Sequence, residues 1–245
     1  MIITFGDSRT GLIRKLNEDA ISFNDKHLFV LADGMGGYEG GQIASTSAVN
    51  SVNQFFEKEM GEFSENTLAQ SVLYANQMIL ELKTTKAEFS SMGTTLIVSA
   101  VQENHFYWAH VGDSRLYLWH DKELTQITTD HSFVMELVSE GKISKEEMRV
   151  HPRKNEITRA VGIEKDLKVD SGSGILQDDS LLLICSDGLT GMLNDQEISQ
   201  MISQSPRKTF NDLKNLGNQL MDAVYKAGAK DNVSLILIQF WNVEN

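Results

Sequence analysis

Hydrophobic residues recur along the chain at two different spacings. Over residues 43–56, and again over 68–82, they return every three or four positions, which predicts two successive helices. Residues 94–101, 105–111 and 115–120 are instead rich in β-branched and aromatic side chains, which predicts three strands. Because the loops between these strands are too short for crossover helices, we expect antiparallel pairing.

The second half of the chain continues this alternation. A polar, partly helical stretch at 130–159 precedes an apolar strand at 180–187, helical spacing near 195–203 and over 206–227, and a final strand at 232–240. Strands therefore lie near both ends and in the middle, with helices in pairs between them. The simplest arrangement is an α+β fold in which packed antiparallel sheets are covered by helices on the outside. We see no linker, so we predict one domain.

The composition is that of a globular protein, and the net charge limits the classes of molecule that it is expected to bind. Of the 245 residues, 41% are hydrophobic and 23% are charged, which is typical of a folded domain. The net charge of −12 disfavours nucleic acid and anionic membranes and favours bound cations. The lone cysteine, Cys185, excludes an intrachain disulfide and indicates a reducing compartment. The first residues lack a signal-peptide pattern and no apolar run is long enough to span a membrane, so we predict a cytoplasmic protein.

Four aspartates stand at the ends of predicted strands. Asp33 and Asp187 each follow an apolar run, Asp113 follows the residues HVG, and Asp231 comes directly before the last strand. Carboxylates gathered at one edge of a sheet repel one another unless cations neutralise them, so we infer a shared divalent metal site. The donors are all oxygen, which favours Mg²⁺ or Mn²⁺ over Zn²⁺. Asp33 and Asp187 are each followed by a glycine, and either Asp-Gly pair taken alone is better explained as a turn.

The glycines around Asp33 also bear on the inferred metal site. The stretch LADGMGGYEGG spans residues 31–41, but Glu39 stands where a dinucleotide-binding GxGxxG pattern needs its last glycine, and no P-loop motif follows. Bare backbone offers carbonyl oxygens, which hard cations bind together with carboxylates. We therefore interpret the glycine-rich stretch as part of the metal site.

Seven short motifs occur along the chain in a fixed order. They are GLIRKLNED (11–19), LADGMGG (31–37), MGTT (92–95), HVGDSRLY (110–117), DHSFVMELVSEGKIS…HPRKNEITRAVG (130–162), LLLICSDGLTGML (181–193) and KDNVSLILI (230–238). With these motifs the chain resembles, over essentially its whole length, the metal-dependent serine/threonine protein phosphatases, the PPM or type 2C family, and in particular their compact bacterial branch. The resemblance implies a four-layer αββα sandwich, with one phosphatase domain over residues 1–245 and a flap at about 130–160.

The resemblance also assigns a role to each acid. Asp33 would bridge two core ions, with the backbone carbonyl of Gly34 on one of them. Asp187 and Asp231 would bind the other ion, and Asp113 would share a weaker third ion with Asp187. Three residues would act around these ligands through bound water or hydrogen bonds: Glu18, Asp19 and Asn232.

Arg14 matches the family's phosphate-binding arginine. We expect its guanidinium to grip two phosphate oxygens at a site remote from the metals. Together with Asp33 it makes up the predicted catalytic pair. Where many eukaryotic members carry a histidine as general acid, this chain has Met35, so we expect a metal-bound water to serve instead. Two histidines of the flap, His131 and His151, are interpreted as structural hydrogen-bonding residues.

The reaction and the partners follow from the same resemblance. A hydroxide bridging two Mn²⁺ or Mg²⁺ ions would attack the phosphorus of phosphoserine or phosphothreonine directly, which would reverse protein kinase signalling. We expect a monomer whose partners are phosphorylated proteins, including a serine/threonine kinase and its substrates, and which binds neither nucleic acid nor membranes. The flap is interpreted as a substrate gate, with a plain surface excursion as the alternative. Two other functions stay open: a module that holds a partner without turnover, and an enzyme acting on small phosphate esters.

Overall fold

The computed structural model describes residues 1–36, 39–58, 62–85 and 87–242. Two antiparallel sheets form its centre, which confirms the predicted pairing. The five-stranded sheet contains, in spatial order, β1 (Ile2–Arg9), β11 (Val233–Phe240), β10 (Ser180–Cys185), β7 (Arg115–His120) and β8 (Glu123–Gln126). The six-stranded sheet contains β2 (Asp19–Phe23), β3 (Leu28–Met35), β5 (Leu96–Gln102), β6 (His105–Val111) and β9 (Asp170–Ile175), and the short β4 (Gly93–Thr94) pairs with β3.

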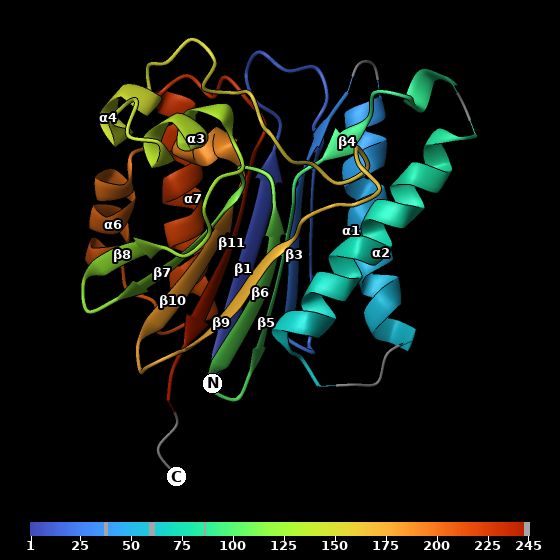
Figure 1. Ribbon diagram of the computed structural model, residues 1–245. Helices are drawn as coiled ribbons and strands as arrows, with labels where there is room; N and C mark the ends of the chain where they lie inside the picture. Colours follow the sequence, from blue (N-terminus) through green and yellow to red (C-terminus); the bar gives the residue numbers. More distant parts are fainter. Residues whose placement is uncertain (37–38, 59–61, 86, 243–245) are drawn as a thin grey trace.

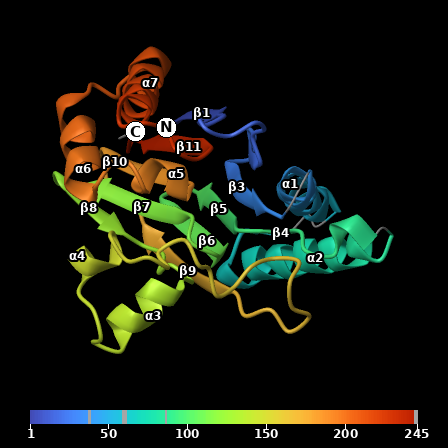
Figure 2. The same cartoon turned by 90° about the horizontal axis from the view of Figure 1, so that it is seen from above.

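Helices cover the outer face of each sheet. The pair α1 (Gly40–Lys58) and α2 (Glu65–Lys83) lies on one side of the molecule, and α6 (Asp195–Gln204) and α7 (Phe210–Lys226) lie on the other (Figure 1). This arrangement confirms the expected αββα sandwich. Three shorter helices, α3 (Phe133–Ser139), α4 (Lys145–Met148) and α5 (Asp187–Thr190), lie near the end of the sheets that faces the viewer in Figure 2. The 3₁₀ turn η1 (Ala87–Phe89) follows α2. Within the described residues, none of the helices combines the length and the apolar character needed to cross a membrane.

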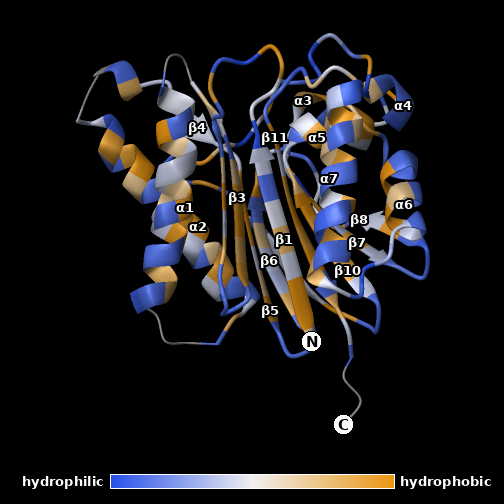
Figure 3. Ribbon diagram, turned by 180° about the vertical axis from the view of Figure 1, so that it is seen from behind, coloured by the Kyte–Doolittle hydropathy of each residue, from blue (hydrophilic) through white to orange (hydrophobic). Residues whose placement is uncertain are grey.

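Three apolar layers hold the sandwich together. One lies between α1, α2 and the six-stranded sheet, and another lies between α6, α7 and the five-stranded sheet. The third lies between the two sheets, where Leu31 and Ile97 face the layer shared with Leu182 and Ile236. The hydrophobic colour in Figure 3 accordingly follows the strands. Strands buried on both faces read as continuous apolar runs, which is why β10 and β11 were predictable from the sequence.

The predicted elements agree with the structure except at some boundaries. The expected strand at 94–101 is divided at Thr95 into β4 and β5, and the expected strand at 180–187 ends at Cys185 because Asp187 begins α5. The helix expected from residue 206 begins at Phe210, since the side chain of Thr209 caps it.

Four strands, β1, β2, β8 and β9, were not predicted. The sequence of β9 is DSGSGI, which has low strand propensity. Its two glycines lie beside aromatic side chains of the neighbouring strand β6: a Cβ on Gly172 would approach Trp108, and one on Gly174 would approach Phe106. Large rings on β6 thus cover the glycines of β9, and this pairing across strands is not visible in β9 itself.

Candidate metal centre and its surroundings

The predicted acids converge because of how the strands pair. Asp19, at the start of β2, is the register partner of Asp33 in β3. In the other sheet β10 and β11 are antiparallel neighbours, so Asp187, just after β10, and Asp231, just before β11, lie at the same end. Asp113 lies in the turn after β6, and all four of these other carboxyl groups act electrostatically on Asp33. The two sheets therefore bring the five aspartates into one cluster.

Asp19 links the two sheets through hydrogen bonds. The hydroxyl groups of Ser186 and Ser234 donate to its Oδ2 at 2.9 and 2.7 Å. Both serines belong to the five-stranded sheet or its edge, whereas Asp19 belongs to the six-stranded sheet. These two serines were not predicted from the sequence, although Ser186 directly precedes Asp187 and Ser234 lies in β11, three positions after Asp231. Asp19 is thus held rigidly in the place where an orienting residue was expected.

Two buried oxygen atoms of the site have no hydrogen-bond partner among the described residues. They are Oε1 of Glu18 and Oδ1 of Asp19. Buried polar atoms in folded proteins are nearly always paired, with protein, water or an ion. Oδ1 of Asp19 belongs to the acid cluster and fits a hydrated cation, because a cation or its water ligands can satisfy this oxygen, whereas Oε1 of Glu18 lies beside Gly41.

Burial and mutual repulsion raise the pKa of every acid of the cluster for which a shift is resolved. Burial, followed by the negative charge of Asp19 and Asp187, raises the pKa of Asp33 well above its usual range. Burial raises the pKa of Asp19 and of Asp187 to about 6. The pKa of Asp113 is raised strongly by burial and by Asp187, and that of Glu18 is raised by burial. A carboxylate cluster of this kind is held in its charged form at neutral pH by bound cations.

The side chains do not form a closed metal cage. Among the described residues, no group of three or more His, Cys, Asp or Glu side chains is arranged to hold an ion by itself. Mg²⁺ and Mn²⁺ prefer oxygen donors, and Mg²⁺ usually keeps several water molecules and takes only one or two carboxylates. The donor set of Asp33, Asp187, Asp231 and Asp113, with nearby orphaned oxygens, fits hydrated ions of this class.

The glycines of the site let its loops approach one another. A Cβ on Gly34 would collide with the carbonyl oxygen of Gly41 and lie 2.6 Å from that of Glu18, and a Cβ on Gly188 would collide with the carbonyl of Asn232. Each of these glycines therefore serves close packing between backbone segments that carry acids. Residues 37 and 38 of the glycine-rich stretch lie outside the described residues.

Arg14 lies closer to the acids than the sequence suggested. Its Nη2 donates to Oδ2 of Asp231 at 2.6 Å, so the expectation of a position remote from the metal ligands was wrong. The reason is the path of its loop, because the N–H of Leu12 donates to the carbonyl of Ala229 at 2.8 Å. The N–H of Gly11 also donates to the side chain of Asn232 at 3.2 Å. The Arg14 side chain remains 46% exposed and can face a ligand.

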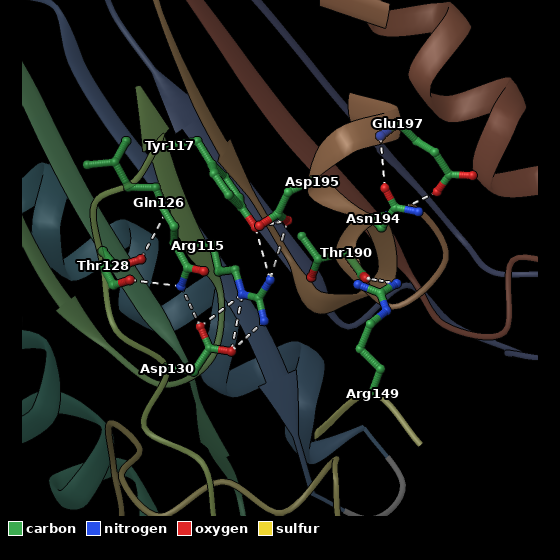
Figure 4. Close-up of polar contacts among 11 residues, drawn as sticks. Arg115, Tyr117, Gln126, Thr128, Asp130, Arg149, Thr190, Asn194, Asp195 and Glu197 are labelled. Carbon is green, nitrogen blue, oxygen red and sulfur yellow. Dashed lines mark hydrogen bonds and ion pairs between the residues drawn. The ribbon is translucent and has the colours of Figure 1, made fainter. Parts of the chain in front are cut away.

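A cavity of about 370 Å³ opens beside Asp113 and Asp187, between the 130–160 segment and helices α5 and α6. Its floor carries a buried ion pair, in which Arg115 donates to both carboxylate oxygens of Asp130 (Figure 4). Arg115 also donates to the hydroxyl of Tyr117 at 2.9 Å. The sequence analysis did not single out this ion pair, although both residues lie in quoted motifs. Because its charges are paired internally, the floor is rigid and presents little free charge.

Arg149 connects the 130–160 segment to the opposite wall of this cavity. Its Nη2 donates to the carbonyl of Thr190 in α5 at 3.2 Å, and Figure 4 shows the side chain reaching across. The segment therefore forms one wall of a cavity that begins at the acids.

Residues 7–233 match the family described as Protein phosphatase 2C. The "Serine/threonine phosphatase stp" of Listeria monocytogenes serotype 4b is 33% identical over 237 residues, which cover 94% of this chain and 92% of that protein.

Solved structures show the same similarity. The serine/threonine phosphatase Stp1 from Staphylococcus aureus has a TM-score of 0.91 and 35% identity, with 99% of this chain and 96% of that chain covered. The catalytic domain of the serine/threonine protein phosphatase PstP, solved in complex with two manganese ions, has a TM-score of 0.88 and 30% identity, with 98% and 99% covered.

The raised pKa values predict how the metal-free protein responds to pH. Asp19 and Asp187 have a pKa of about 6 in the folded state, above the value of about 4 expected in the unfolded chain. The folded state therefore binds protons more tightly at these two groups. Their contribution to the free energy of unfolding is fully present below about pH 4 and is lost as the pH rises through 6. We expect the metal-free protein to melt at a lower temperature at pH 7.5 than at pH 5.

Replacing one repelling acid should relieve this loss. Asp33→Asn should raise the free energy of unfolding of the metal-free protein at pH 7.5 by about 1–2 kcal/mol and flatten the pH dependence. Asp166→Asn, at an exposed position, is the matched control and should do neither. A lower stability of Asp33→Asn at pH 7.5 would show that the cluster is not under electrostatic strain.

Proposed function

The chain belongs to the protein phosphatase 2C family and is a metal-dependent serine/threonine phosphatase, and we propose that the acid cluster at the end of its two sheets is the catalytic site. Five buried or half-buried aspartates that meet from two sheets support this assignment, because their repulsion requires cations. A module that only binds a partner has no need for such a costly cluster. Every acid expected for metal binding is present.

Four groups would hold the two core ions. Asp33 would be shared between them, with the carbonyl of Gly34 beside it, and Asp187 and Asp231 would complete the set from the other sheet. Divalent ions bound in this way supply an activated water and neutralise charge on phosphate oxygens. The manganese ions of the PstP structure support Mn²⁺ as the metal; we extend this to Mg²⁺ and to a weaker third ion shared by Asp113 and Asp187.

The remaining residues orient these groups. Asp19, fixed by Ser186 and Ser234, would position the cluster from the six-stranded sheet, and Glu18 would accept a hydrogen bond from an ion-bound water. Asn232 acts indirectly, since it anchors the loop that carries Arg14. Water acts as the nucleophile, because the only cysteine is fully buried and burial raises the pKa of Cys185 to about 12.

Arg14 is proposed as the phosphate-binding residue. Its guanidinium presents more donors than the single bond to Asp231 uses, and its partial exposure leaves them open to a ligand. A phosphate held there would lie beside Asp231, between Arg14 and the proposed ions.

The biological setting extends beyond the catalytic site. The chain acts on phosphorylated proteins, and we propose a serine/threonine kinase and its substrates as partners, a monomeric state and a cytoplasmic location. Residues 1–245 are proposed to form one phosphatase domain. Residues 130–160 are proposed as a flap that controls access to the cavity.

Phosphate release from two substrates tests the function. With Mn²⁺ present, the protein should release phosphate from a phosphothreonine peptide, and Asp33→Asn should lose nearly all of this activity while remaining folded by circular dichroism. A small aryl phosphate is the comparison, and a preference for it would favour an enzyme of small phosphate esters. Binding of the peptide without release at saturating Mn²⁺ would favour a binding module.

Arg14→Ala should raise KM for the phosphopeptide about tenfold with a smaller change in kcat, because binding to the ground-state phosphate is lost. Its affinity for Mn²⁺, measured by isothermal titration, should not fall, because Asp231 loses a competing partner. Lys15→Ala on the same loop is the control. An unchanged KM would remove Arg14 from the phosphate site.

Asp113→Ala should keep two tightly bound Mn²⁺ ions but lower kcat by about a hundredfold, because a preorganised charge next to the leaving oxygen is worth about 3 kcal/mol. Asp121→Ala, in the turn after β7, is the control for a turn aspartate. Steady-state kinetics at saturating Mn²⁺ and a thermal melt separate the two roles. Wild-type kcat with a lowered melting temperature would mean that Asp113 is only a turn residue.

A further inference from the structure

His131 lies at the start of the flap and is bound twice to the loop that carries Asp113. Its backbone N–H donates to the carbonyl of Gly112 at 2.8 Å, and the N–H of Gly112 donates back to Nδ1 of the His131 ring at 3.1 Å. The histidine is only 5% exposed. These two reciprocal hydrogen bonds, one to the backbone and one to the buried ring of His131, fix the position of the residue that precedes Asp113.

The hydrogen bond from Gly112 to Nδ1 determines the tautomer of the ring. Because Nδ1 accepts a hydrogen bond, the ring hydrogen of neutral His131 must be on Nε2. This Nε2 lies 3.1 Å from Oδ2 of Asp170, which accepts the hydrogen. Arg159 lies equally near Nε2 but directs its Nη1 to the other oxygen of Asp170 at 3.0 Å. The ring therefore bridges the Asp113 loop on one side and the start of β9 on the other.

The two ends of the flap are hydrogen-bonded to each other at His131 and the residues next to it. The N–H of Thr158, at the end of the flap, donates to the carbonyl of His131 at 2.8 Å. The adjacent Ser132 forms a β-bridge with Ile157, and the N–H of Phe133 donates to the carbonyl of Glu156. The flap thus has a paired base, and His131 is the residue of that base that also contacts the catalytic end of the sheets.

On the side away from His131, the Gly112 loop packs against Thr95, which also contacts Asp33. Gly112 has φ of +113°, and a Cβ there would lie 2.6 Å from the side chain of Thr95. The hydroxyl of Thr95 accepts from the N–H of Asp33 at 2.9 Å and shares a hydrogen bond with Ser114 at 2.8 Å. Residues 112–114 are therefore held between Thr95 and His131.

We propose that His131 is a positioning residue that joins the base of the flap to the Asp113 loop, so that both are held as one unit. The inference rests on the proposed role of Asp113 and deepens it. A side chain that served only to fill space would need neither the acceptor at Nδ1 nor the donor at Nε2. Its contact with the His110 ring, at 4.7 Å between centroids, is the packing part of its role.

Hydrogen exchange of the metal-free protein tests the link without reference to activity. In His131→Ala the Gly112 amide should exchange about tenfold faster or more, because it loses its acceptor. His131→Asn places an oxygen near the position of Nδ1 and should restore most of the protection, whereas His131→Gln reaches toward Asp170 and should not. His120→Ala, in β7, is the control and should leave Gly112 unchanged, as should amides of β11 in every variant.

Kinetics on a double-mutant cycle test the functional side. His131→Ala should lower kcat for the phosphopeptide about tenfold with little change in KM, but in the Asp113→Ala background it should lower kcat by less than about twofold. This dependence is evidence of coupling that a loss of stability alone does not produce.

Several outcomes would overturn the proposal. One is an unchanged exchange rate of the Gly112 amide in His131→Ala. Another is protection of this amide that is restored in His131→Gln but not in His131→Asn. The third is an equal loss of kcat from His131→Ala in the wild-type and Asp113→Ala backgrounds. Failure of the wild-type protein to hydrolyse phosphopeptides would count against the proposed function, and the exchange experiment would still decide whether His131 holds the loop.

Discussion

Repulsion among buried carboxyl groups is the constraint around which this structure is organised. Asp33 is surrounded by other acids, and burial raises the pKa of Asp33, Asp187 and Asp113. Such a cluster costs folding free energy, so the rest of the chain must hold it in place. Three apolar layers and the hydrogen bonds from Ser186 and Ser234 to Asp19 provide that support. At neutral pH bound cations relieve this repulsion, so in the proposed site the same event would serve stability and catalysis.

The acids and the wall of the neighbouring cavity are built from different kinds of structural element. The acids come from strand ends and tight glycine turns, where a side chain would collide with neighbouring backbone. The cavity wall is built instead from the short helices α3 and α4, which Arg149 and the base at His131 connect to the core. A site of this design keeps the reacting groups fixed while its substrate-facing wall can vary.

Much of the site was predictable because its chemistry is local in the sequence. Asp33, Asp187 and Asp231 stand beside apolar runs that already read as strands, and a sheet edge gathers such residues. The serine contacts to Asp19 could not be derived, since Ser186 and Ser234 are separated from it by 167 and 215 positions. The strand β9 was missed for the same reason, because its glycines make sense only beside the aromatic rings of β6. Patterns within one segment are readable, whereas pairings between distant segments are not.

The ion pair between Arg14 and Asp231 couples the two ligands of the proposed site. In the structure Arg14 neutralises Asp231. A cation bound at Asp231 in the proposed site would compete with Arg14 and free its guanidinium for a phosphate. Thermodynamic linkage makes this effect reciprocal, so a bound phosphate would strengthen the hold on the cation by the same factor. A single arginine would thereby make the two ligands cooperative, whichever of them binds first.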